Sequence, residues 1–135
     1  VESGLPGWVF SGAGPLGDKL FCLGGMSTML MGVPPPAAAQ RDAVAFERYL
    51  QGLRQAGWSG DTGVIRLGYT AWMTVWLGVV FPNIMALWCT PDFRPYALQQ
   101  FGFVEEELYL QWLPVLPYIL DCADEARLLI KRLHL

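Results

Sequence analysis

Residues 57–88 read GWSGDTGVIRLGYTAWMTVWLGVVFPNIMALW, and the interpretation of the whole chain depends on them. The stretch opens with a turn from Gly57 to Asp61, and Arg66 is the only charged residue after that turn. From Leu67 to Pro91 the chain has no charged residue. A segment this apolar must be covered by lipid, by the rest of the chain, or by a part that lies outside this sequence.

The uncharged run is 25 residues long, which is enough to cross a bilayer as a helix. Its sequence nevertheless favours a buried core helix or helix pair. Gly68, Gly78 and the Pro82-Asn83 pair interrupt it, and we expect Pro82 to break or kink the helix. The aromatic residues are spread along the run instead of forming two belts, and no basic cluster flanks it. A membrane span is therefore the less favoured alternative.

The composition indicates a single partial domain, residues 1–135. Hydrophobic residues make up 53% of the chain and charged residues 16%, against about 25% charged residues in a typical soluble domain. We expect an apolar face that is covered by something absent from this sequence, such as a protein partner. The net charge is −3 and the basic residues form no patch, which argues against a nucleic-acid partner.

The three cysteines, Cys22, Cys89 and Cys122, stand far apart, and the only histidine is His134. This pattern predicts neither a zinc site nor a disulfide framework. Each cysteine lies in apolar sequence, so we expect buried, reduced thiols and a cytoplasmic protein.

Residues 1–17 predict a loop, because seven of them are glycine or proline, and residues 18–135 predict a helical lobe. Gly12–Gly17 fits the phosphate-binding pattern G-x-G-x-x-G, but no clear strand precedes it and no acidic residue follows at the required spacing. We expect a helix from Asp18 to about Met31, then a stiff, extended connector at Val33–Pro36.

The clearest helical pattern runs from Gln40 to Ala56. Its apolar stripe has the spacing i, i+3, i+7, i+10 and consists of Ala43, Phe46, Leu50 and Leu53. Gly57 is placed to end this helix, and Asp61 is placed to cap the next one, which begins at about Thr62.

The C-terminal third predicts further helices. After a turn at Thr90–Pro95 and a short helix, Glu105–Glu107 suits the positive end of another helix, which Pro114 and Pro117 should kink or divide. A last helix is expected at Tyr118–Leu133. Its apolar side consists of Ile119, Cys122, Ala126, Leu129, Ile130 and Leu133. The predicted class is all-α, with five or six helices and a buried central one.

Two stretches resemble aminoglycoside-phosphotransferase and choline-kinase-like enzymes. Trp8–Leu20, WVFSGAGPLGDKL, is similar to the segment after the family's metal-binding motif: a tryptophan, a loop of small residues, and Asp-Leu opening a helix. Tyr49–Asp61, YLQGLRQAGWSGD, with VIRLGY at Val64–Tyr69, resembles the helix–turn–helix of the C-terminal lobe in bacterial members. The resemblance covers about residues 5–80.

This resemblance implies the helical C-terminal lobe of a kinase-like fold. It also implies that the N-terminal nucleotide-binding lobe, which could cover the apolar face, is missing from this chain. In the family, ATP and Mg²⁺ are bound by an N-terminal lobe and a catalytic loop that precede the residue matched by Trp8. The metal-binding aspartate would fall at position 7, which is Gly7 here, and the next acidic position is Lys19, with Asp18 one place early. No catalytic, cofactor-binding or metal-binding residue of the family therefore transfers to this chain.

The implied function is acceptor binding in a small-molecule phosphotransferase, in a truncated or degenerate form that is inactive alone. Asp61, Tyr69, Trp72 and Trp76 could line the acceptor-binding face, but the sequence favours core packing for the three aromatic residues and a helix cap for Asp61. Two alternatives remain open: a non-enzymatic interaction module and a small membrane-associated helical protein.

We predict that the isolated chain transfers no phosphoryl group from ATP, because phosphoryl transfer needs placed metal ions, phosphate ligands and a base. A radiometric assay with Mg²⁺-ATP and a broad panel of small-molecule acceptors tests this. Turnover above the level of a protein-free blank would contradict it.

Overall fold

The computed structural model describes residues 16–17, 20, 35–102 and 105–135, and every regular element in these ranges is a helix. The all-α class is thus confirmed for the described part of the chain. The elements are α2 (Pro35–Gln55), α3 (Thr62–Val75), the π-helical turn η2 (Trp76–Val80), α4 (Phe81–Trp88), α5 (Arg94–Phe101), α6 (Glu105–Trp112), the 3-10 turn η3 (Leu113–Val115) and α7 (Leu116–Leu133). Most of the predicted loop 1–17 and the helix expected at Asp18–Met31 lie outside the described residues.

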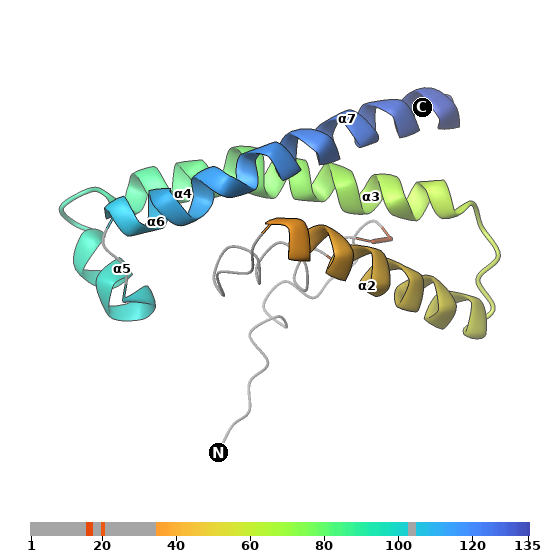
Figure 1. Cartoon of the computed structure of the whole chain (residues 1–135), viewed down its shortest axis with the longest axis horizontal. Helices are drawn as coiled ribbons and strands as arrows, with labels where there is room; N and C mark the ends of the chain where they lie inside the picture. The colour runs from red at the N-terminus through yellow and green to blue at the C-terminus, as the bar shows by residue number, and fades with distance from the viewer. Residues whose placement is uncertain (1–15, 18–19, 21–34, 103–104) are drawn as a thin grey trace, which may run out of the picture.

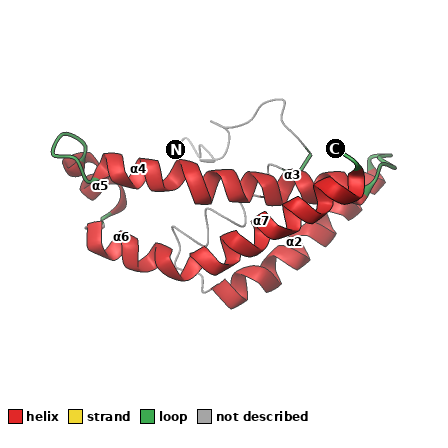
Figure 2. Ribbon diagram, turned by 90° about the horizontal axis from the view of Figure 1, so that it is seen from above, coloured by secondary structure: helices red, strands yellow, loops and turns green. Residues whose placement is uncertain are grey.

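Two long helical rods lie side by side and run in opposite directions (Figures 1 and 2). The first consists of α3, η2 and α4, and the second of α6, η3 and α7, with α5 at the end where the chain passes between them. The main contact between the rods is that of α3 with α7. The third long helix, α2, joins this pair at the end where α3 begins and α7 ends (Figure 1).

The first rod buries every fourth residue along one face. These residues are Ile65, Tyr69, Met73, Leu77, Phe81 and Met85. Its opposite face leaves Val64, Val75, Val79 and Leu87 exposed. The prediction that the central helix is buried is therefore confirmed for the face from Ile65 to Met85 and wrong for the opposite face. Among the described helices, the 27 residues Thr62–Trp88 form the one that is long and apolar enough to cross a membrane.

Contrary to expectation, Pro82 does not break this rod. The π-helical turn comes directly before it, and the Phe81 N–H donates to the Trp76 carbonyl. Pro82 then lies in the first turn of α4, where a missing N–H is tolerated. The Asn83 side-chain amide donates to the Val79 carbonyl at 2.7 Å, one turn back along the helix. The local widening of the helix thus accommodates the proline.

The predicted turn between α2 and α3 is confirmed. Gly57 has φ of 87°, which favours glycine, and the Trp58 N–H donates to the Leu53 carbonyl at 2.9 Å, as in a helix C-terminal cap. At the other end of the turn, the Asp61 carboxylate accepts from the Gly63 N–H at 2.7 Å and caps α3. These two caps fix where α2 ends and α3 begins.

The beginning of α2 differs from the expectation. The helix starts at Pro35 instead of Gln40, so Pro35 and Pro36 belong to its first turn and not to an extended connector. Proline is tolerated there because its φ suits a helix and the first N–H groups need no partner within the helix.

The inward face of α2 is also rotated relative to the predicted stripe. Leu50 is buried, Phe46 and Leu53 are half-buried, but Ala43 is exposed. The neighbouring Asp42 is buried instead. A carboxylate is buried in preference to a methyl group only where it has polar partners, and these partners help to build the candidate site described below.

The C-terminal helices largely follow the sequence. The acidic start of α6 and the division near Pro114 are confirmed, the latter as the 3-10 turn η3. Most of the predicted apolar side of α7 is buried, in the form of Ile119, Cys122, Ala126 and Leu129. The prediction is wrong for Ile130, which is 41% exposed on a flank of the helix that no described element covers completely.

Gly17, the last glycine of the predicted loop, lies against the backbone of α3. Its φ is 96°, and a Cβ at this position would lie 2.4 Å from the Ile65 carbonyl oxygen and 3.1 Å from the Tyr69 nitrogen. Both the dihedral angle and the close approach require glycine. This residue therefore has a structural role in packing the loop on α3.

We predict that Gly17→Ala lowers the free energy of unfolding by on the order of 1–3 kcal/mol, because it forces a side chain into a glycine conformation and a backbone clash. Urea unfolding followed by circular dichroism measures the change. Gly52→Ala is the matched control: Gly52 lies inside α2 with open space around it, and alanine there should stabilise by up to about 1 kcal/mol. Equal effects of the two substitutions would contradict the role of Gly17.

Candidate functional site

α2, α3 and α7 enclose a groove of about 470 Å³ at the end of the molecule where all three meet. α2 contributes Asp42, Phe46 and Glu47, α3 contributes Thr62, Gly63 and Arg66, and α7 contributes Tyr118, Glu125, Leu129 and Arg132. The volume lies within the range of small-molecule sites, and the lining combines aromatic, aliphatic and charged side chains.

A chain of hydrogen bonds joins the three helices beneath this groove. The Tyr69 hydroxyl donates to the Asp42 carboxylate and lies 3.1 Å from the Tyr118 hydroxyl. Since Tyr69 has only one hydroxyl proton and gives it to Asp42, Tyr118 is the donor in the contact between the tyrosines. The protons therefore point from α7 through α3 to α2, and the Tyr118 oxygen keeps acceptor capacity.

Asp42 is the buried end of this chain, with 6% of its surface exposed. Burial raises the pKa of its carboxyl group, and the hydrogen bond from Tyr69 and the charges of Arg41 and Arg66 only partly oppose this. The pKa of Tyr69 is also raised, by burial first and by Asp42 second. Tyr69 thus stays protonated and acts as a donor, not as a base or nucleophile.

An ion pair between α3 and α7 forms the next part of the groove. Arg66 Nε donates to Glu125 Oε1 at 2.8 Å and Arg66 Nη2 to Glu125 Oε2 at 2.7 Å, which is the parallel two-bond geometry of a strong pair. The guanidinium carbon also lies 5.1 Å from the Phe46 ring centroid and 5.3 Å from that of Tyr69. Burial opposes the positive charge, but the bonds from Glu125 leave the pKa of Arg66 raised. The positive charge of Arg66 is therefore already paired with Glu125 inside the protein.

Arg132 and Asp61 form the mouth of the groove near the start of α3. Arg132 Nη2 lies 3.5 Å from Asp61 Oδ1, and the two side chains are 60% and 57% exposed. The guanidinium also lies on Gly63, where a Cβ would be 1.9 Å from Nη2. A long, exposed ion pair contributes little to stability, so Asp61 does little to fix the position of Arg132. The guanidinium lies where it does because Gly63 has no side chain to exclude it.

Neither of the two described thiols lines the groove. Cys122 is buried below the ion pair, where burial raises its pKa to about 12, and it is reduced. Cys89 is a half-buried free thiol, and Cys22 lies outside the described residues. The expected buried, inert thiol is thus confirmed for Cys122.

The residues suggested for an acceptor face do not come together. Tyr69 lies in the network under the groove, but Asp61 is a helix cap at its mouth. Trp72 and Trp76 pack against the core with their ring centroids 6.2 Å apart, and neither lines the groove. Gly7 and Lys19 lie outside the described residues.

Sequence reasoning missed four residues of the site: Asp42, Arg66, Tyr118 and Glu125. Two signals were available. Asp42 stands four residues before Phe46, on the same face of α2, and Arg66 is the last charge before the uncharged run. The partner of Arg66 is 59 residues away in sequence, a separation that no local pattern reveals.

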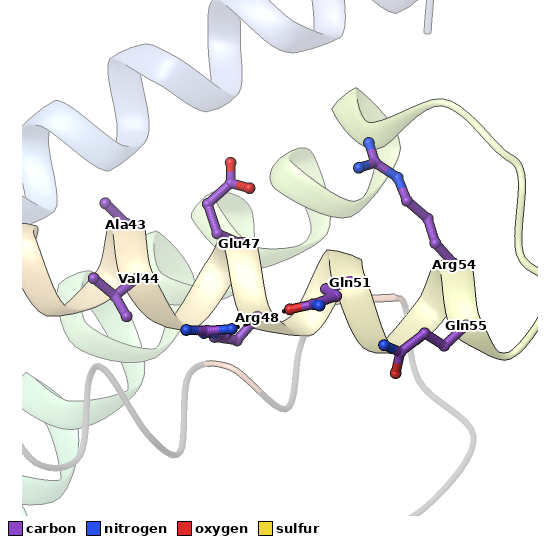
Figure 3. A pocket seen from close by; sticks show the side chains of 7 residues that line it. All are labelled: Ala43, Val44, Glu47, Arg48, Gln51, Arg54 and Gln55. Carbon is purple, nitrogen blue, oxygen red and sulfur yellow. Dashed lines mark hydrogen bonds between the residues drawn. The ribbon is translucent and has the colours of Figure 1, made fainter.

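A second hollow is lined, among the described residues, by side chains of α2. These are Ala43, Val44, Glu47, Arg48, Gln51, Arg54 and Gln55 (Figure 3). Glu47 belongs to both hollows, and Figure 3 shows its carboxylate rising toward the side on which α7 runs.

Within the described ranges, no three His, Cys, Asp or Glu side chains lie close enough together to hold a metal ion. Comparison of the chain with protein-family models, with curated proteins and with solved structures finds no match.

The buried carboxylate gives a pH-dependent prediction. The pKa of Asp42 is raised in the folded state. Its favourable contribution to folding stability is therefore present below its pKa in the unfolded chain, and it is lost as the pH rises through its pKa in the folded protein. Asp42→Asn keeps an acceptor for Tyr69 without the charge. At about pH 7 its free energy of unfolding should therefore equal or exceed that of the wild type. Below about pH 4, where the wild-type carboxyl group is protonated, any gain over the wild type should vanish.

Asp42→Ala should instead cost on the order of 1–3 kcal/mol, because it leaves the Tyr69 hydroxyl without its acceptor. Urea unfolding at both pH values compares these variants, with the exposed Asp121→Asn as control. If the asparagine variant loses as much stability as the alanine variant at neutral pH, the inferred cost of the buried charge is wrong.

The Arg66–Glu125 pair should show energetic coupling in a double-mutant cycle with Arg66→Met and Glu125→Gln. We expect about 1–3 kcal/mol from unfolding measurements, because the two bonds are parallel and half-buried. Arg127 and Asp124 provide the control: their pair lies on the outside of α7 with the side chains 73% and 69% exposed. Coupling there should stay below about 0.5 kcal/mol. Equal coupling in both pairs would refute the special role of the groove pair.

Proposed function

We propose that these helices are the acceptor-binding lobe of a small-molecule phosphotransferase of kinase-like fold, and that the acceptor occupies the groove between α2, α3 and α7. The observation that carries the proposal is the groove itself. It brings polar and charged side chains from three helices together at one end of the two rods. Such convergence over a fixed hydrogen-bond network is what orients a small ligand.

The packing of Gly17 on α3 supports this proposal. The two stretches that carry the family resemblance, the loop ending at Gly17–Leu20 and the turn leading into α3, meet in the structure at Ile65 and Tyr69. Tyr69 is also the central member of the network under the groove. Gly17 therefore packs on the same helix that supplies the centre of this network.

Within this function the chain would bind and orient the acceptor. Asp42 and the Tyr118 oxygen can accept a hydrogen bond from an acceptor hydroxyl, and Phe46 and Leu129 can cover its apolar part. The described residues include no cluster of carboxylates for Mg²⁺, and Gly7 has no side chain to supply one.

The exposed apolar side of the first rod favours a second candidate, a module that binds another apolar protein surface. Val75, Val79 and Leu87 lie exposed within the run Leu67–Pro91, which has no charge. Contiguous apolar surface of this kind is typical of interaction sites. A chain that stays monomeric at high concentration in sedimentation measurements would count against this candidate.

The acceptor proposal is tested by nuclear magnetic resonance titration of the labelled chain with a library of small hydroxylated compounds. We expect binders to shift the amide signals of α2, α3 and α7 around the groove, and Tyr118→Phe to weaken binding by about tenfold while Tyr109→Phe, on exposed α6, has no effect. A library whose binders all act elsewhere, or that contains no binder, would refute the proposal.

A further inference from the structure

Some charged side chains of the groove already have a strong partner within the protein, and others do not. Arg66 and Glu125 neutralise each other through two short bonds, and Asp42 is held by Tyr69. Two charges remain available to a ligand. One is Arg132 on the α7 wall, and the other is Glu47 on the α2 wall.

Glu47 is exposed, and no described residue forms an ion pair or a hydrogen bond with it. Arg132 has only its long contact with Asp61, whose carboxylate is also committed to the Gly63 N–H at 2.7 Å. A ligand could therefore engage both groups without breaking a strong interaction of the protein.

Both charged side chains line the same groove, Arg132 from α7 and Glu47 from α2. Arg132 lies against Gly63 at the start of α3, and the Glu47 carboxylate rises from α2 toward the side on which α7 runs (Figure 3). A single small molecule can thus lie between a cation on one wall and an anion on the other.

We infer that the groove takes a small hydroxylated zwitterion, whose anionic group binds Arg132 and whose ammonium group binds Glu47. This inference rests on the proposed function and specifies the class of acceptor. A purely cationic ligand would leave Arg132 unmatched, and a purely anionic one would lie against the Glu47 carboxylate. The hydroxyl group of the ligand then faces Asp42 and Tyr118, deeper in the groove.

Three related probes test the inference in the same titration: L-serine, glycerate and ethanolamine. Each has a hydroxyl group, but glycerate lacks the ammonium group and ethanolamine lacks the carboxylate. We expect serine to bind the groove about tenfold or more tightly than either of the others. Arg132→Met should reduce serine binding to the level of ethanolamine, and Glu47→Gln should reduce it to the level of glycerate.

Lys131→Met and Asp121→Asn are the matched controls, because both residues are exposed charges of α7 outside the groove and should leave serine binding unchanged. Ethanolamine or glycerate binding the groove as tightly as serine would overturn the zwitterion and leave the acceptor groove standing. Serine binding that is weakened by neither Arg132→Met nor Glu47→Gln would also overturn the zwitterion and leave the acceptor groove standing. If no hydroxylated compound binds the groove, the zwitterion and the proposed function fail together.

Discussion

The hydrogen bond from Tyr69 to Asp42 is the interaction on which the groove end of the molecule depends. A carboxylate buried without a partner would cost several kcal/mol, so α2 can dock only with Asp42 turned toward α3. That rotation exposes Ala43 and places Phe46 beside the Arg66 guanidinium. Tyr118 extends the same network to α7. One polar contact thereby sets the orientation of α2 and, with it, one wall of the groove.

The position of the groove follows from the distribution of charge along the chain. Met73 and Leu77 lie in an uncharged run and pack in the core between the rods, whereas Arg66 stands just before that run and reaches across to Glu125. The rods are therefore held together by apolar burial along the middle and by an ion pair at the end where α2 joins. At this end the groove brings together charged and hydrogen-bonding side chains from three helices. Apolar recognition is possible along the outer face of α3 and α4.

Local sequence signals predicted the parts of the fold that local physics controls. The cap at Gly57, the cap at Asp61 and most of the buried side of α7 depend on residues close in sequence, and these predictions are confirmed. The errors at Ala43 and Ile130 arose because exposure depends on which neighbouring helix covers a face, which periodicity does not specify. The groove escaped prediction for the same reason: its network joins Asp42, Tyr69 and Tyr118, which come from three helices.

The π-helical turn at Trp76–Val80 also keeps the two halves of the long rod in phase. Residues spaced four apart drift by about 40° per step around an ordinary α-helix, so the buried row from Ile65 to Met85 would wind about 200° around it. The extra residue of the wider turn takes back about 100° of that drift. The number of residues in this turn is therefore fixed more tightly than their identity. Losing one residue would close the turn into a regular helix and swing Phe81 and Met85 away from the side that faces the core.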